Sequence, residues 1–168
     1  VPILKIYRFY IILRFMNKTN QRNFIRSLSI TAAMGALIIV MGLTHIGFIP
    51  WFSGASITIM QVPVIIAAIL AGKFSGFGTG LIFGVFSLIQ AAIAPIGPLD
   101  PFFVNPLVSI LPRVLMGLGT YFCYAAFNKI NNFPKSLNYA ISGFLGSLIN
   151  TCLVLLTLVI LKAIDFKM

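Results

Sequence analysis

Most of this chain consists of apolar runs that are about as long as a lipid bilayer is thick. We place these runs at about 27–46, 57–72, 76–93, 106–127 and 138–161. A helix needs roughly 20 mainly apolar residues to cross the hydrocarbon core, and its backbone hydrogen bonds are all satisfied within the segment. We therefore predict an all-α integral membrane protein with five transmembrane helices at these positions.

The overall composition excludes the other broad classes of protein. Hydrophobic residues make up 60% of the 168 residues and charged residues only 8%. Soluble domains carry about 25% charged residues, and disordered chains are poor in apolar residues and rich in charge. Neither a soluble domain nor a disordered chain fits this sequence.

The basic residues are distributed unevenly along the chain. Twelve Lys and Arg stand against two acidic residues, and half of the twelve lie within residues 1–26. Lys73, Lys129 and Lys135 lie in turns on the same side of the membrane as that segment, whereas the two loops on the other side carry no Lys or Arg. Cytoplasmic loops are enriched in these residues. We expect a cytoplasmic N-terminus, a basic interfacial segment over 1–26, a membrane domain over 27–168 and no nucleic-acid partner.

The two ends of the chain raise separate questions. Lys162 and Lys167 fall on the outer side of a five-helix arrangement, against the charge bias. A sixth helix would return the C-terminus to the cytoplasm, so we expect five helices of a six-helix bundle, with a natural five-helix protein as the alternative. Val1 and Met16 are both candidate starts.

Arg113 is the most informative single residue because it lies inside an apolar run. A guanidinium within a span costs about 2.5 kcal/mol or more and marks a functional site by default. Asn105, Ser109 and Arg113 are spaced four residues apart and line one helix face, with Asn105 as the N-cap. Pro112 lacks a backbone donor, which predicts a free carbonyl near Val108.

Asn150 lies in the last apolar run, at a depth from the outer surface comparable to that of Arg113. Polar groups at one level on two helices predict an outward-facing pocket for a small anionic molecule. The alternative is that Arg113 pairs with Asn150 or with backbone carbonyls and holds the helices together. His45 and Trp51 in the first outer loop form either a lid over this pocket or an aromatic belt at the membrane interface.

Small residues recur at four-residue spacing in two of the apolar runs. Ala32 and Ala36 lie in the first run, and Gly80 and Gly84 in the third. Such spacing lets helices approach closely in lipid. Docking of a partner membrane subunit and packing within this chain are both consistent with the pattern.

Sequence motifs for catalysis and metal binding are absent. The chain has no GxxxxGKS/T phosphate loop, no HExxH motif and no paired carboxylates. We expect this protein not to be an enzyme and to use no metal or cofactor.

Three stretches of the sequence carry a resemblance to a known family. They read ITIMQVPVIIAAILAGKFSGFGTGLIFGVFSLI, DPFFVNPLVSILPRVLMGL and SLINTCLVL. Together with Ala32 and Ala36 in the first helix, they resemble the substrate-binding S component of an energy-coupling factor (ECF) transporter over about residues 26–161. The run FFVNPLVSILPR is the most specific part and is most similar to the pantothenate branch.

This resemblance implies a six-helix protein of the bacterial cell membrane that binds a vitamin from the outside. The vitamin would pass through a membrane T component that works with two cytoplasmic ATPase subunits. Asn105, Arg113 and Asn150 would bind the vitamin, and Ala32 and Ala36 would contact the T component. The family has a sixth helix after the SLINTCLVL helix, and we expect this chain to lack it.

Pantothenate is the favoured ligand, because its carboxylate suits the guanidinium of Arg113 through charge-assisted hydrogen bonds. Another vitamin, such as hydroxymethylpyrimidine or riboflavin, is one alternative. A structural or assembly membrane protein without a ligand is the other.

Overall fold

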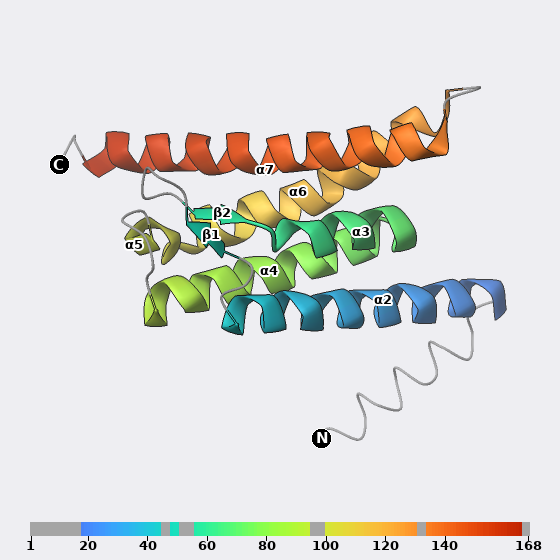
Figure 1. The fold of residues 1–168 in the computed structure, drawn as a ribbon, viewed down its shortest axis with the longest axis horizontal. Helices are drawn as coiled ribbons and strands as arrows, with labels where there is room; N and C mark the ends of the chain where they lie inside the picture. Colours follow the sequence, from blue (N-terminus) through green and yellow to red (C-terminus); the bar gives the residue numbers. More distant parts are fainter. Residues whose placement is uncertain (1–17, 45–47, 51–55, 95–99, 131–133, 166–168) are drawn as a thin grey trace, which may run out of the picture.

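The computed structural model describes residues 18–44, 48–50, 56–94, 100–130 and 134–165. Figure 1 shows the long helices side by side in one bundle, with α7 along one edge and α2 along the opposite edge. The elements are α2 (Lys18–Leu43), β1 (Phe48–Pro50), β2 (Ser56–Thr58), α3 (Gln61–Ala71), α4 (Lys73–Ile93), α5 (Asp100–Phe103), α6 (Pro106–Phe127) and α7 (Lys135–Asp165).

Four of these helices, α2, α4, α6 and α7, are long and apolar enough to cross a membrane. Large apolar side chains such as Phe74, Phe122 and Phe144 are exposed on the outside of the bundle. A continuous apolar exterior is typical of a surface that contacts lipid rather than water. The predicted class, an all-α integral membrane protein, is confirmed.

The second predicted helix, over 57–72, is wrong in its first part. Ser56–Thr58 forms strand β2, which pairs antiparallel with β1, and α3 begins only at Gln61. Pro63 suits the first turn of a helix, because the backbone donor that it lacks has no partner there. The remaining 11 residues of α3 extend for only about 16 Å at 1.5 Å per residue, about half the thickness of the hydrocarbon core.

The other helices differ from their predicted ranges mainly at the ends. The prediction of 106–127 matches α6, where the side chain of Asn105 accepts a hydrogen bond from the backbone of Leu107 at 3.1 Å and so caps the helix. Helix α2 starts at Lys18 and not at the predicted residue 27, so the polar basic residues before residue 27 are helical as well. Helix α7 extends the predicted 138–161 at both ends.

A single glycine connects α3 to α4. Gly72 has a φ of 85°, a conformation that side chains with a Cβ rarely adopt. The chain therefore reverses direction between Ala71 and Lys73 without a longer loop, and α4 lies directly beside α3.

The α4–α6 interface brings two helix backbones into contact through glycines. A Cβ added to Gly80 would lie 2.5 Å from the carbonyl oxygen of Arg113, and one added to Gly84 would lie 2.7 Å from the Cα of Ile110. Both glycines are buried within the chain. Of the two alternatives for Gly80 and Gly84, the structure therefore favours packing within the chain over docking of a partner subunit, since their lack of a side chain is used for packing against α6.

Helix α2 is attached to the bundle by hydroxyl groups in its N-terminal half. The Ser27 and Ser75 hydroxyls lie 2.7 Å apart, and Thr31 donates to the Ser75 hydroxyl at 3.0 Å. In lipid, hydrogen bonds of this kind contribute about 1 kcal/mol each to helix association. Ala32 and Ala36 lie on the exposed side of α2, away from this network.

Candidate functional site

Arg113 lies in the N-terminal half of α6 and is almost completely buried, with 7% of its surface exposed. It follows the N-cap by eight residues, which places it about 12 Å along the helix axis. Its Nη1 donates to the carbonyl oxygen of Val108 at 2.7 Å, and its Nη2 lies 3.4 Å from the hydroxyl of Ser87 on α4. Its Nε is buried without a hydrogen-bond partner in the described part of the chain.

The carbonyl of Val108 is available because Pro112 has no N–H. In a regular helix that carbonyl would accept from the backbone of residue 112. The predicted free carbonyl is thus confirmed, and the acceptor is used by the neighbouring guanidinium. Of the partners foreseen for Arg113, the structure forms the backbone carbonyl and not Asn150.

Two aromatic rings lie against the guanidinium of Arg113. Its Cζ is 4.8 Å from the ring centre of Phe103 in α5 and 5.5 Å from that of Phe83 in α4. The negative faces of such rings attract a cation and stabilise it by about 1–2 kcal/mol when water is excluded. Sequence reasoning missed both rings, although Phe103 lies two residues before the N-cap of α6 and Phe83 lies one residue before Gly84.

Asn105 and Ser109, the other members of the predicted polar face, both have structural partners. The Asn105 side chain caps α6 and is exposed. Ser109 is fully buried, and its hydroxyl donates to the carbonyl of Gly84 at 3.2 Å. Both residues therefore fix the helix that carries Arg113, whatever their role toward a ligand.

Asn150 belongs to a second polar group, which connects α3 to α7. The Gln61 amide donates to the hydroxyl of Ser147 at 2.8 Å, and the Asn150 amide is 3.5 Å from the Gln61 oxygen. The Asn150 oxygen is buried without a partner among the described residues. Gln61 was not among the predicted site residues, because an amide at the start of an apolar run is also typical of a side chain that reaches toward the membrane interface.

His45 and Trp51, the predicted lid residues, lie outside the described residues. The described neighbours of that loop, β1 and β2, form a short antiparallel pair at the same end of the bundle as α5 (Figure 1). This end of the bundle also contains the start of α6 and the ends of α2 and α4.

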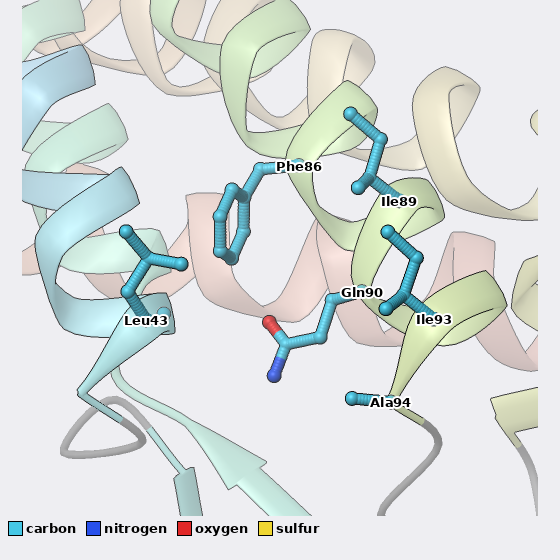
Figure 2. A pocket seen from close by; sticks show the side chains of 7 residues that line it. Leu43, Phe86, Ile89, Gln90, Ile93 and Ala94 are labelled. Carbon is cyan, nitrogen blue, oxygen red and sulfur yellow. The ribbon is translucent and has the colours of Figure 1, made fainter.

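A small cavity of about 150 Å³ lies between the C-terminal ends of α2 and α4 (Figure 2). Its lining is apolar apart from Gln90, whose side-chain oxygen is buried without a partner in the described chain. The lining residues are Gly42, Leu43, Phe86, Ile89, Gln90, Ile93 and Ala94. None of them is a predicted site residue, so this cavity is separate from the surroundings of Arg113 and Asn150.

Comparison with known proteins gives consistent results over most of the chain. Residues 7–168 match the sequence model of the family described as the ECF transporter, substrate-specific component. One relative, "Pantothenate transporter PanT" of Leuconostoc mesenteroides, is 37% identical over 136 residues, which is 77% of this chain and 66% of the relative. Another, "Pantothenic acid transporter PanT" of Lactococcus lactis subsp. cremoris, is 28% identical over 132 residues, which is 71% of this chain and 64% of the relative. The chain thus spans just under two thirds of the length of these relatives.

Proposed function

This chain belongs to the family of substrate-specific components of ECF transporters, and we propose that it captures pantothenate at the outer face of the bacterial cell membrane. Both relatives named above are called transporters of pantothenate or pantothenic acid. The protein is a multi-pass membrane protein of a transporter family. Its proposed part in transport is binding without chemical change of the ligand.

The observation that carries this proposal is the buried guanidinium of Arg113. Its Nε has no partner, and among the described residues it forms no ion pair. A ligand carboxylate would supply both the missing acceptor and the missing negative charge. Charge-assisted pairs between arginine and carboxylate are about twice as strong as neutral hydrogen bonds.

The second polar group suits the rest of the same ligand. Pantothenate carries an amide and two hydroxyl groups beyond its carboxylate, and these need neutral donors and acceptors. Gln61 and Asn150 offer amide groups, and one of their oxygens is buried and unpartnered. We propose that this group binds the neutral end of pantothenate while Arg113 binds the anionic end.

We further propose that the protein works with a membrane T component and two cytoplasmic ATPase subunits. Family membership supports this assembly. The exposed side of α2 with Ala32 and Ala36 supports a docking surface there, because small exposed residues allow another helix to approach closely.

Binding of tritiated pantothenate to the detergent-purified protein tests this function. We expect saturable binding to the wild-type protein and a loss of affinity of at least about 100-fold for Arg113→Ala, the upper range for a hydrogen bond to a charged group. Size-exclusion chromatography of the variant separates loss of binding from loss of the folded protein.

The choice of ligand is tested by competition with other vitamins. We expect unlabelled pantothenate to displace the bound label and riboflavin or hydroxymethylpyrimidine to leave it in place. Absence of saturable pantothenate binding by a folded wild-type protein would contradict the proposed substrate.

A further inference from the structure

We propose that Pro112 is a positioning residue for ligand recognition, because the carbonyl that it leaves free holds one end of the Arg113 guanidinium and directs the other edge toward a carboxylate. This inference rests on the proposed function, since it assigns how Arg113 recognises an anionic ligand. It goes further by assigning a role to the proline and to one particular edge of the guanidinium.

The carbonyl oxygen of Val108 can accept a hydrogen bond either from the backbone of residue 112 or from the Arg113 side chain. Any residue other than proline at position 112 would donate its own N–H to this oxygen. With Pro112 in place the oxygen is free, and Nη1 of Arg113 donates to it at 2.7 Å. The side chain of Arg113 is thereby folded back along its own helix and held at one nitrogen.

Two nitrogens of the Arg113 guanidinium, Nε and Nη2, remain as donors when Nη1 is bound to Val108. The Nε of Arg113 has no partner among the residues that the structure describes, and Nη2 is 3.4 Å from the Ser87 hydroxyl, which is long for a hydrogen bond. In a planar guanidinium that is held at Nη1, Nε and Nη2 form the opposite edge and direct two parallel N–H groups in one direction. A carboxylate binds such a pair of donors in a bidentate manner.

Aromatic rings lie against the guanidinium of Arg113. The Cζ of Arg113 lies over the rings of Phe103 and Phe83, which provide no conventional acceptor for its N–H groups. The aromatic contacts limit rotation of the group, and the carbonyl of Val108 fixes its remaining freedom. The free edge is therefore oriented before a ligand arrives, and prior orientation raises affinity because less ordering is needed on binding.

The test compares two ligands that differ only in the group that Arg113 recognises. Pantothenol carries a hydroxymethyl group in place of the carboxylate of pantothenate. The affinity ratio of pantothenate to pantothenol, measured by competition against tritiated pantothenate, reports the orientation of Arg113. In Pro112→Ala the new N–H takes the Val108 carbonyl, and we expect the ratio to fall about tenfold, the lower range for loss of one hydrogen bond to a charged group.

Pro106→Ala is the matched control on the same helix. Pro106 is the first residue of α6, where a backbone N–H has no acceptor within the helix, so no carbonyl is taken from Arg113. We expect this variant to keep the wild-type affinity ratio. A fall in the ratio as large as that of Pro112→Ala would overturn the proposal.

A double variant separates positioning from a general disturbance of the helix. If Pro112 acts through Arg113, Pro112→Ala has no further effect on the ratio once Arg113→Ala is present, because the two substitutions remove one interaction. Additive effects would overturn the proposal. Arg113→Lys provides a test in which Pro112 is unchanged: an ammonium group keeps the positive charge but has no planar edge, so we expect the ratio to fall, by less than in Arg113→Ala. Retention of the wild-type ratio by Arg113→Lys would also overturn the proposal.

The outcomes distinguish this inference from the proposed function. Equal affinity of the wild-type protein for pantothenate and pantothenol contradicts the assigned role of Arg113, and the inference about Pro112 with it. A wild-type preference that is lost in Arg113→Ala but kept in a folded Pro112→Ala contradicts the inference alone.

Discussion

At the scale of single residues, the positive charge of Arg113 is stabilised by neutral groups. A backbone carbonyl, a serine hydroxyl and two aromatic rings surround it in the described chain. Each of them stabilises a cation less than a carboxylate does. A buried cation without a counter-charge favours a ligand that brings one, and this imbalance connects the packing of α6 to anion capture.

The proposed role of Gln61 in binding can be tested against a control residue of the same type, Gln90. We expect Gln61→Ala to weaken pantothenate binding about tenfold, because it removes an amide that holds both Ser147 and Asn150. Gln90→Ala removes an amide at the outer end of another helix, beside the small apolar cavity, and is expected to leave the affinity unchanged. Isothermal titration calorimetry of both variants would decide, and equal effects would show that Gln61 has no specific role.

The sequence predicted features within one helix better than contacts between helices. Burial of Arg113 and a free carbonyl at Val108 follow from local rules, because depth and helix hydrogen bonding depend only on position along one helix. The pairing of Asn150 with Gln61 depends on how α3 and α7 are arranged in space. Nothing in the spacing along either helix specifies that arrangement.

At the scale of helices, the contact between α4 and α6 determines where Arg113 lies. Gly80 packs against the carbonyl of Arg113 itself, and Gly84 packs beside the residues that precede it. Close packing of two backbones in lipid is stabilised by van der Waals contacts, since lipid is as apolar as the helix surface. Gly80 and Gly84 thus hold α6 at a fixed distance from Phe83 and Ser87 on α4.

Adding one methyl group tests this packing. We expect Gly80→Ala to destabilise the protein by about 2 kcal/mol, because the new Cβ would lie 2.5 Å from a backbone oxygen that cannot move independently. Gly143→Ala is the control: its Cβ would meet the side chain of Ile65 at 3.4 Å, which is close to an ordinary van der Waals contact, and alanine favours the helix by about 1 kcal/mol over glycine. Thermal unfolding in detergent measures both, and equal melting temperatures for the two variants would contradict the tight interface.

Prediction at this scale succeeded where local signals were strong. Asn105 and the following proline define the start of α6, because both residue types favour that position in a helix. The start of α3 was predicted too early, because hydropathy does not show where the short strand Ser56–Thr58 ends and the apolar helix begins. Spacing alone also left open whether Gly80 and Gly84 face a partner or the chain itself.

At the scale of the whole molecule, the two ends of the bundle differ in chemistry. The starts of α2, α4 and α7 lie together at one end, and β1, β2 and α5 lie at the other (Figure 1). Exposed basic residues such as Arg22, Lys73 and Lys135 lie at the first end. We expect that end to be cytoplasmic, because positively charged loops are retained on that side of the membrane.

Labelling of single cysteines in intact cells tests this orientation. In a chain with Cys123→Ala and Cys152→Ala, we expect a membrane-impermeant maleimide to label Ala94→Cys but not Lys135→Cys. Both positions are exposed at the ends of helices, so accessibility in opened cells should be equal and provides the control. The reverse labelling pattern would invert the assignment of the binding face.

The shortness of α3 has a consequence for the solvent around the binding residues. The 11 residues of α3 extend through only part of the thickness of the bilayer. The rest of that thickness is left to β1 and β2, which are only three residues each. The outer edges of a two-stranded pair carry unpaired backbone groups, which lipid does not tolerate and which must meet protein or water. We expect the bilayer to thin beside α3 and a hydrated vestibule to reach inward from the outer surface. A vitamin anion that enters there would shed its hydration shell gradually and would cross little hydrocarbon on its way to Arg113.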